Sequence, residues 1–199
     1  MKTKLKSTVE VDDSAIIFDN VTFIGRCKVG ANAIIYPFSI IIDSEIGANC
    51  TIFCSVVENS HISNCVSIGP FAHIRPDCSI ESGCRIGNFV EIKNSVIGKN
   101  TKISHLAYVG DASVGENCNI GCGAIFVNYD GMKKNHTVVG DSCFIGSNCN
   151  IIAPIRLADY TYICAGTTVT SDSQENDFII GRVRPITKAN RAKKYWEGA

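Results

Sequence analysis

The sequence predicts an all-β protein that coils as a parallel β-helix of hexapeptide repeats. Aliphatic residues recur every six positions over two stretches, which are Ile68, Ile74, Ile80, Ile86 and Ile92, then Val139, Ile145, Ile151, Leu157, Ile163 and Val169. This period matches neither an amphipathic helix, with about 3.6 residues per turn, nor plain strand alternation. It therefore indicates a repeating backbone unit. Glycine or another small residue commonly follows the aliphatic position and eases the corner that the chain has to turn there.

Three hexads are expected to form one triangular coil of about 18 residues, and successive coils stack at about 4.8 Å, the ordinary strand spacing. Such a stack holds one continuous core and has no internal domain boundary unless the period fails. We therefore expect a lead-in over residues 1–20, a β-helix over residues 21–180 and a basic tail over residues 181–199.

Two departures from the period predict irregular structure. The hexads stop between Ile125 and Val138, where a turn-forming, basic segment predicts a bulged loop near residues 125–138. The C-terminal tail has six basic residues and one acidic residue, a net charge of +5. We expect this tail to be irregular or to hold a short helix near 189–196, either as a solvated end or as a grip on a phosphate-rich ligand.

The composition excludes several classes of function. With 19 basic and 19 acidic residues the formal net charge is zero, which argues against binding to nucleic acid or to an anionic membrane. No apolar segment has the length of a signal or a membrane span, so we expect a cytoplasmic protein. The sequence has 11 cysteines and no CxxC pair, and we expect reduced packing residues rather than disulfides or a metal site. Six of them occupy the inward fifth place of a hexad, namely Cys50, Cys78, Cys84, Cys118, Cys143 and Cys149.

The register of the hexads places several polar residues on one face. Arg75 and Lys93 stand three hexads apart at equivalent corners, so their cations are stacked and form a candidate phosphate site. Glu91 and Tyr108 point outward from the strands that enter this corner, and His105 lies where one of those strands begins. Histidine is the side chain best suited to accept a proton near neutral pH, although the same face is also compatible with an ordinary solvated surface. A zinc site would need three convergent histidines, which the spacing of the four histidines does not favour.

Five motifs stand out along the chain, namely Gly87-Asn88-Phe89-Val90-Glu91-Ile92-Lys93, His105-Leu106-Ala107-Tyr108-Val109-Gly110-Asp111-Ala112, Asn119-Ile120-Gly121, Asn128-Tyr129-Asp130-Gly131 and Ala165-Gly166-Thr167-Thr168-Val169-Thr170. Together they resemble the C-terminal acetyltransferase domain of the bifunctional glucosamine-1-phosphate acetyltransferase and N-acetylglucosamine-1-phosphate uridylyltransferase. The resemblance runs from about Val21 to Arg182. It implies a left-handed β-helix, assembly as a homotrimer, and acetyl-CoA as co-substrate without a metal.

The resemblance also implies roles for individual residues. His105 would be the general base. Arg75 and Lys93 would hold the sugar phosphate, Tyr108 and Asn119 would bind the sugar, and Glu91 would orient the amine or His105. The acetyl-CoA side would consist of Cys122, Asn128, Tyr129, Lys134, Ser147, Ala165 and Arg182, and Lys134 would reach a neighbouring chain. The family commonly has alanine where Cys122 stands, and smaller or polar residues where Ala124 and Phe126 stand, which puts the fit near the loop in question.

The implied reaction moves the acetyl group of acetyl-CoA to the amine of glucosamine 1-phosphate, a step toward UDP-N-acetylglucosamine and cell-wall precursors. The nucleotide-binding part of the bifunctional enzymes has no counterpart in these 199 residues, so we expect no uridylyl transfer by this chain. It would be a stand-alone acetyltransferase or a fragment of a longer protein. Two alternatives remain, namely another amino sugar or nucleotide sugar as acceptor, and a non-catalytic sugar-phosphate-binding partner of a separate uridylyltransferase.

Overall fold

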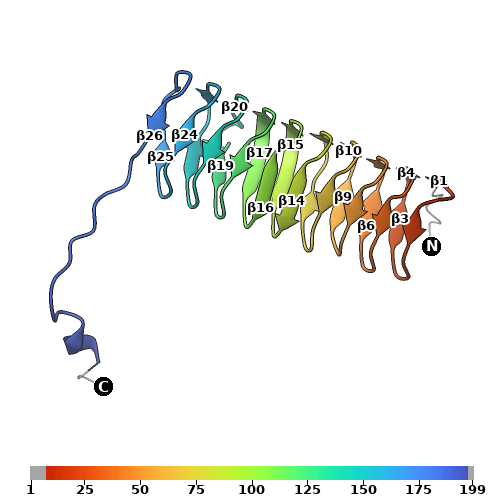
Figure 1. Cartoon of the computed structure of the whole chain (residues 1–199), viewed down its shortest axis with the longest axis horizontal. Coiled ribbons are helices and arrows are strands. Elements are labelled where there is room, and N and C mark those ends of the chain that lie inside the picture. The colour runs from red at the N-terminus through yellow and green to blue at the C-terminus, as the bar shows by residue number, and fades with distance from the viewer. Residues whose placement is uncertain (1–7, 197–199) are drawn as a thin grey trace.

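The computed structural model describes residues 8–196, and its strands coil into a left-handed parallel β-helix. Figure 1 shows the coils stacked along one axis, with the N-terminal coil at one end and the C-terminal tail leaving the other. The predicted fold class is confirmed. No helix within residues 8–196 is both long and apolar enough to cross a membrane.

The coils have three faces, which we number in the order of their first strands. The first face contains β1 (Thr8–Val11), β4 (Arg26–Val29), β7 (Glu45–Ile46), β10 (Ser60–Ile62), β13 (Cys78–Ile80), β20 (Thr137–Val139) and β23 (Ile155–Leu157). The second contains β2 (Ile16–Ile17), β5 (Ile34–Ile35), β8 (Thr51–Ile52), β11 (Ser67–Ile68), β14 (Arg85–Asn88), β16 (Lys102–His105), β18 (Asn119–Ile120), β21 (Phe144–Ile145), β24 (Tyr162–Ile163) and β26 (Phe178–Ile179). The third contains β3 (Thr22–Ile24), β6 (Ile40–Ile42), β9 (Val56–Glu58), β12 (His73–Ile74), β19 (Ile125–Val127), β22 (Asn150–Ile152) and β25 (Thr168–Val169). β15 (Glu91–Ile97) and β17 (Tyr108–Val114) turn the corner from the third face to the first.

The register of the strands follows the predicted coil length with two variations. Ser60 pairs with Cys78, a full three hexads later. Ser79 pairs with Val96 after a slightly shorter coil, because the step from Ile92 to Ile97 has five residues instead of six. Ala112 pairs with Thr137 after a longer coil, since this coil carries the bulged loop. Side chains that lie at equivalent positions of successive coils therefore form columns.

The core consists of the predicted aliphatic columns. Every aliphatic residue of the two series with six-residue spacing is buried, with at most 3% of its surface exposed. The six cysteines at the fifth place are also buried, and no cysteine of the chain forms a disulfide. Burial raises the pKa of the Cys84 thiol to about 11, which suits a reduced packing residue.

The structure sets element boundaries that differ from the expected ones. β1 and β2 lie within residues 1–20 and pair with β4 and β5, so coiling begins before residue 21. At the bulged loop β19 continues the helix as far as Val127, because Phe126 points into the core and is fully buried. The bulge itself runs from residue 128 to 136. The tail extends away from the coils and holds a short 3-10 helix, η1 (Lys193–Tyr195).

The corners of the coils use left-handed backbone, mostly at asparagine, aspartate and glycine, which tolerate it best. The corner between the second and third faces is different. It has Phe38, Phe71, Phe89 and Leu106 in this conformation, with φ between 48° and 61°. These side chains are 54–69% exposed, and the Phe71 and Phe89 rings stack at 5.6 Å. We call this set the apolar ridge.

Candidate active site

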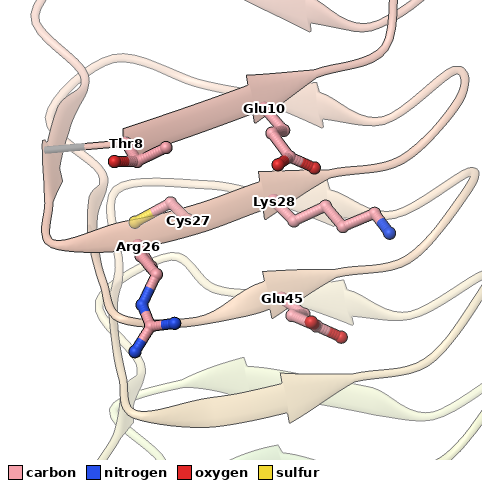
Figure 2. A pocket seen from close by; sticks show the side chains of 6 residues that line it. All are labelled: Thr8, Glu10, Arg26, Cys27, Lys28 and Glu45. Atoms are coloured by element: carbon pink, nitrogen blue, oxygen red, sulfur yellow. The ribbon is translucent and has the colours of Figure 1, made fainter.

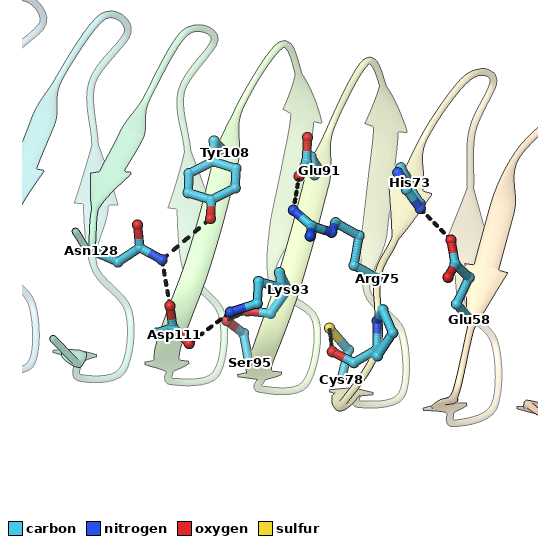
Figure 3. Close-up of polar contacts among 11 residues, drawn as sticks. Glu58, His73, Arg75, Cys78, Glu91, Lys93, Ser95, Tyr108, Asp111 and Asn128 are labelled. Atoms are coloured by element: carbon cyan, nitrogen blue, oxygen red, sulfur yellow. Dashed lines mark hydrogen bonds and ion pairs between the residues drawn. The ribbon is translucent and has the colours of Figure 1, made fainter. Parts of the chain in front are cut away.

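The third face brings most of the predicted sugar-phosphate residues together on adjacent coils. β12 pairs with β15 and β15 with β17, so that His73, Glu91 and Tyr108 form one outward column. Arg75 and Lys93 follow at equivalent positions of the next column, as the register predicts. Figure 3 shows these side chains on one side of the helix.

Carboxylates of the chain itself balance the stacked cations. Arg75 Nη1 donates to Glu91 Oε1 at 2.8 Å, and Lys93 Nζ donates to Asp111 Oδ1 at 3.3 Å. In the same pattern His73 Nε2 lies 2.7 Å from Glu58 Oε1. The hydrogen bond to Glu91 raises the pKa of Arg75. Glu91 therefore contacts Arg75, and the expectation that it orients the amine or His105 stays a prediction.

A third cation joins this pair from the bulged loop. The Lys134 side chain lies beside Lys93, and this neighbour lowers the pKa of Lys134, with a smaller contribution from Arg75. Lys134 and Lys93 are thus neighbours, and the charge of Arg75 also acts on Lys134. Such a cluster favours an anion with several oxygen acceptors. That Lys134 reaches a neighbouring chain stays a prediction.

Asp111 is a site residue that the sequence reasoning did not single out. It lies at the corner between the third and first faces, and only 7% of its surface is exposed. Its carboxylate accepts hydrogen bonds from Asn94 Nδ2 at 2.6 Å and from Asn128 Nδ2, besides Lys93. Desolvation alone would raise the pKa of Asp111, but the donors of Asn94, Asn128 and Lys93 outweigh it and the pKa is lowered. The carboxylate is therefore ionised at neutral pH.

His105 lies at the corner between the second and third faces, one coil after Asn88. Its Nδ1 atom is 2.6 Å from Asn88 Oδ1. An amide oxygen can only accept a hydrogen bond, so Nδ1 donates to it, and in the neutral form of the ring the lone pair is then on Nε2. The ring is exposed. This geometry leaves an oriented, exposed imidazole ring at the corner.

The same corner carries part of the predicted acetyl-CoA side. Ile103, Ile120, Ile145 and Ile163 pair in succession, so the residues two positions after each form a column of His105, Cys122, Ser147 and Ala165. Arg182 Nη1 donates to the Ala165 carbonyl at 3.1 Å. Gly121 and Gly123 donate to neighbouring coils, whereas the Cys122 N–H has no acceptor among residues 8–196. Among these residues a backbone donor is therefore free one coil from His105.

The bulged loop is a preformed turn rather than a slack connection. Asp130 accepts hydrogen bonds from the backbone of Met132 and Lys133 and from Asn135 Nδ2, and these donors hold the pKa of Asp130 at about 2. Tyr129 is exposed, and its hydroxyl donates to the Gly131 carbonyl at 2.7 Å. Asn128 at the loop's first position is buried and donates to Tyr108 Oη at 3.3 Å and to Asp111.

The side-chain directions place Asn119 apart from this cluster and place Ala124 and Phe126 inside the core, while sugar binding by Asn119 stays a prediction. Asn119 points outward from β18 on the second face, so a single chain does not bring it to the cluster on the third face. Ala124 and Phe126 are fully buried in the core, so neither lines an acetyl-CoA pocket.

A shallow pocket near the N-terminal end contains none of the predicted site residues. It lies on the first face and is lined by Thr8, Glu10, Arg26, Cys27, Lys28 and Glu45 (Figure 2). Within residues 8–196 no ion pair joins two of these pocket-lining side chains to each other. No group of three or more His, Cys, Asp or Glu residues in that range is placed to hold a metal ion.

Comparisons with known proteins agree with the repeats. The family described as "GMPPB C-terminal domain" matches residues 56–129, and "Bacterial transferase hexapeptide (six repeats)" matches residues 136–171. The "Bifunctional protein GlmU" of Caldicellulosiruptor saccharolyticus is 47% identical over 198 residues, which cover 98% of this chain and 43% of that protein. The GlmU protein of Clostridium beijerinckii is 48% identical over 176 residues, which cover 88% of this chain and 39% of that protein. The chain thus spans about two fifths of the length of these relatives.

Two solved structures share the fold at low sequence identity. The UDP-N-acetylglucosamine acyltransferase of Arabidopsis superposes with a TM-score of 0.56 at 20% identity, over 84% of this chain and 67% of that one. LpxA, a UDP-N-acetylglucosamine acyltransferase from Bacteroides fragilis, gives a TM-score of 0.51 at 20% identity, over 86% of this chain and 68% of that one. At this identity the likeness shows the β-helix alone.

Proposed function

Because the chain belongs to the family of the GlmU proteins and carries bacterial-transferase hexapeptide repeats, we propose that it acetylates the amine of glucosamine 1-phosphate with acetyl-CoA. One observation carries the proposal. His105, oriented by Asn88, shares a column with Cys122, Ser147 and Ala165, and the next strand, β17, pairs with β15, which carries Lys93 on the third face. A base, an anion site and a free backbone donor are the parts that acetyl transfer to an amine needs.

The residues act in the following roles. Arg75, Lys93 and Lys134 hold the phosphate of the sugar, and His105 Nε2 accepts the proton of the amine as the amine attacks the thioester carbonyl. The free Cys122 N–H donates to the oxyanion that develops, a contact typically worth about 3 kcal/mol. The CoA thiolate then leaves. This sequence needs no covalent enzyme intermediate, so Cys122 acts through its backbone and its thiol need not be a nucleophile.

The activity is tested with the purified chain, acetyl-CoA and a panel of amino sugars and amino-sugar phosphates. Because Cys65 is exposed and Cys122 is partly exposed, a thiol reagent would also titrate the protein, so the acetylated product is best followed by mass spectrometry. We expect an acetylated glucosamine 1-phosphate. Acetylation of a different amino sugar alone would favour the alternative acceptor, and binding of sugar phosphates without any acetylated product would favour a non-catalytic partner.

We also propose that three copies assemble around the apolar ridge, in the cytoplasm. The ridge lies between the third face, which carries Lys93 and Tyr108, and the second face, which carries Asn119. If three ridges meet on a three-fold axis, the third face of each copy lies opposite the second face of the next. The sugar site would then be completed by Asn119 of a neighbouring copy.

Complementation tests this composite site. Lys93→Ala and Asn119→Ala are each expected to be weakly active, because each removes one half of every site. In randomly mixed trimers about one quarter of the sites combine an intact Lys93 with an intact neighbouring Asn119. Activity should therefore return to roughly that fraction after co-expression. No recovery in demonstrably mixed oligomers would contradict a site shared between copies.

A further inference from the structure

Asp111 differs from the residues that occupy its position in other coils. The corner between the third and first faces repeats Asp43, Asn59, Asp77, Asn94 and Asp111, all with left-handed backbone. Aspartate and asparagine tolerate this conformation well, so the backbone alone accounts for either residue there. Asp43 and Asp77 are exposed, whereas Asp111 is buried. A buried, ionised carboxylate is costly unless its partners compensate, which points to a specific role.

The partners of Asp111 come from three different parts of the site. Lys93 belongs to the cation cluster, Asn94 is the preceding corner residue and Asn128 starts the bulged loop. Figure 3 shows the carboxylate between Lys93 and Asn128, with the Tyr108 hydroxyl close by. Asp111 thus joins the predicted phosphate side of the site to the predicted acetyl-CoA side.

Gly110 makes this junction possible. A Cβ atom at residue 110 would lie 2.4 Å from Tyr108 Oη and 2.7 Å from Asn128 Nδ2. Both atoms therefore approach the backbone of residue 110 more closely than any other residue type would permit. Glycine at this position lets the side chains of Tyr108 and Asn128 come close to the backbone, where they meet beside the Asp111 carboxylate.

We propose that Asp111 is a positioning residue that holds the Lys93 ammonium and the first residue of the bulged loop in fixed relation, so that both substrates depend on its charge. The inference rests on the function proposed above. Asp111 does not contact the reacting atoms. It acts through Lys93 on the sugar phosphate and through Asn128 on acetyl-CoA.

Asp111→Asn is the informative substitution because asparagine keeps the side-chain shape and the left-handed backbone. Its new NH₂ group would face the donors of Lys93, Asn94 and Asn128, so at least one of these contacts is lost. The matched control is Asp77→Asn, at the same corner one coil earlier than Asn94. Among residues 8–196 the Asp77 side chain accepts a hydrogen bond from Asn59 Nδ2, at 3.0 Å, and touches neither Lys93 nor Asn128.

Calorimetric binding of glucosamine 1-phosphate and, separately, of acetyl-CoA tests the proposal without relying on turnover. We expect Asp111→Asn to raise both dissociation constants by about 10- to 100-fold, the effect of losing hydrogen bonds to a charged group. Asp77→Asn should leave both unchanged. Adding Asp111→Asn to Lys93→Ala should weaken sugar-phosphate binding little further, while the acetyl-CoA effect remains.

The outcomes separate this inference from the proposed function. If the wild-type chain binds neither ligand, the proposed function fails. If the wild type binds both and Asp111→Asn binds them equally well, the positioning role is wrong. Equal losses in Asp77→Asn and Asp111→Asn would show a general need for the corner residue and would also overturn the proposal. A wild-type-like melting temperature of both variants guards against unfolding as the cause.

Discussion

The Nδ1 atom of His105 and the Oδ1 atom of Asn88 lie 2.6 Å apart across two successive coils. This contact fixes the imidazole tautomer that exposes a free lone pair on Nε2. We expect Asn88→Ala to lower kcat about tenfold, the equivalent of one hydrogen bond of about 1.4 kcal/mol, with little change in the KM of either substrate. Asn88→Asp should keep more activity, because a carboxylate also accepts from Nδ1. Steady-state kinetics of both variants check this, and an unchanged kcat in Asn88→Ala would remove Asn88 from the site.

Replacing the base itself should have a larger effect on the same step. We expect His105→Ala to lower kcat by about 10² to 10⁴, the usual contribution of a general base, while the acetyl-CoA dissociation constant stays close to wild type. His136→Ala is a suitable control, because the His136 ring contacts Ser113 at the surface of the loop and none of the site residues named above. Near-normal turnover of His105→Ala would exclude it as the base.

The regular part of this fold could be predicted from the sequence because one period sets both the core and the register. All the aliphatic residues of the two series with six-residue spacing are buried, and the three-hexad coil stacked Arg75 on Lys93. The roles of Asn88 and Asp111 were missed because corner residues look alike in sequence. Asp77 and Asp111 occupy equivalent corners, and only the three-dimensional partners make one of them part of a site. The start of the bulged loop was placed too early, at residue 125. The loop is inserted directly after β19, so no hexad follows Phe126 in the sequence to mark it as an inward residue.

The burial of Phe126 predicts a loss of stability rather than of cofactor fit. Phe126→Ala should lower the free energy of unfolding by about 3–5 kcal/mol, as large-to-small core substitutions do. Phe178→Ala is the control, because that ring is 65% exposed and its stacking on Tyr162 contributes only about 1 kcal/mol. Denaturant unfolding at one fixed protein concentration measures both. Normal stability of Phe126→Ala together with weaker acetyl-CoA binding would instead return Phe126 to the pocket.

The cation cluster makes anion binding depend on pH. Lys93 lowers the pKa of Lys134, so Lys134 loses its proton below the ordinary lysine range as the pH rises. A phosphate binds the protonated form of Lys134 better, so the affinity for a sugar phosphate should fall as Lys134 loses its proton. Over the same pH range the free protein gains stability, because the repulsion between Lys134 and Lys93 is relieved. Glucose 1-phosphate is the suitable ligand, because it has no amine that titrates. Calorimetry from about pH 7.5 to about pH 10 should show this fall, and Lys134→Arg should flatten it. A slope that persists unchanged in Lys134→Arg would assign the titration to another group.

The apolar ridge predicts which substitutions dissociate the assembly without harming the chain. Phe71→Asn combined with Phe89→Asn places a residue suited to left-handed backbone where phenylalanine is strained, so each coil should fold at least as well as before. The same change removes two aromatic side chains, each more than half exposed in the single chain, from the proposed three-fold contact. We expect sedimentation to show monomers, with turnover lost because Asn119 of the next copy no longer completes the site. Tyr160→Asn is the matched control, since Tyr160 also has left-handed backbone, with φ 59°, and is 57% exposed, but it lies at the corner between the first and second faces. That variant should remain a trimer with full activity. A double variant that sediments like the wild type, or a Tyr160→Asn variant that dissociates equally, would place the contact between copies elsewhere on the β-helix.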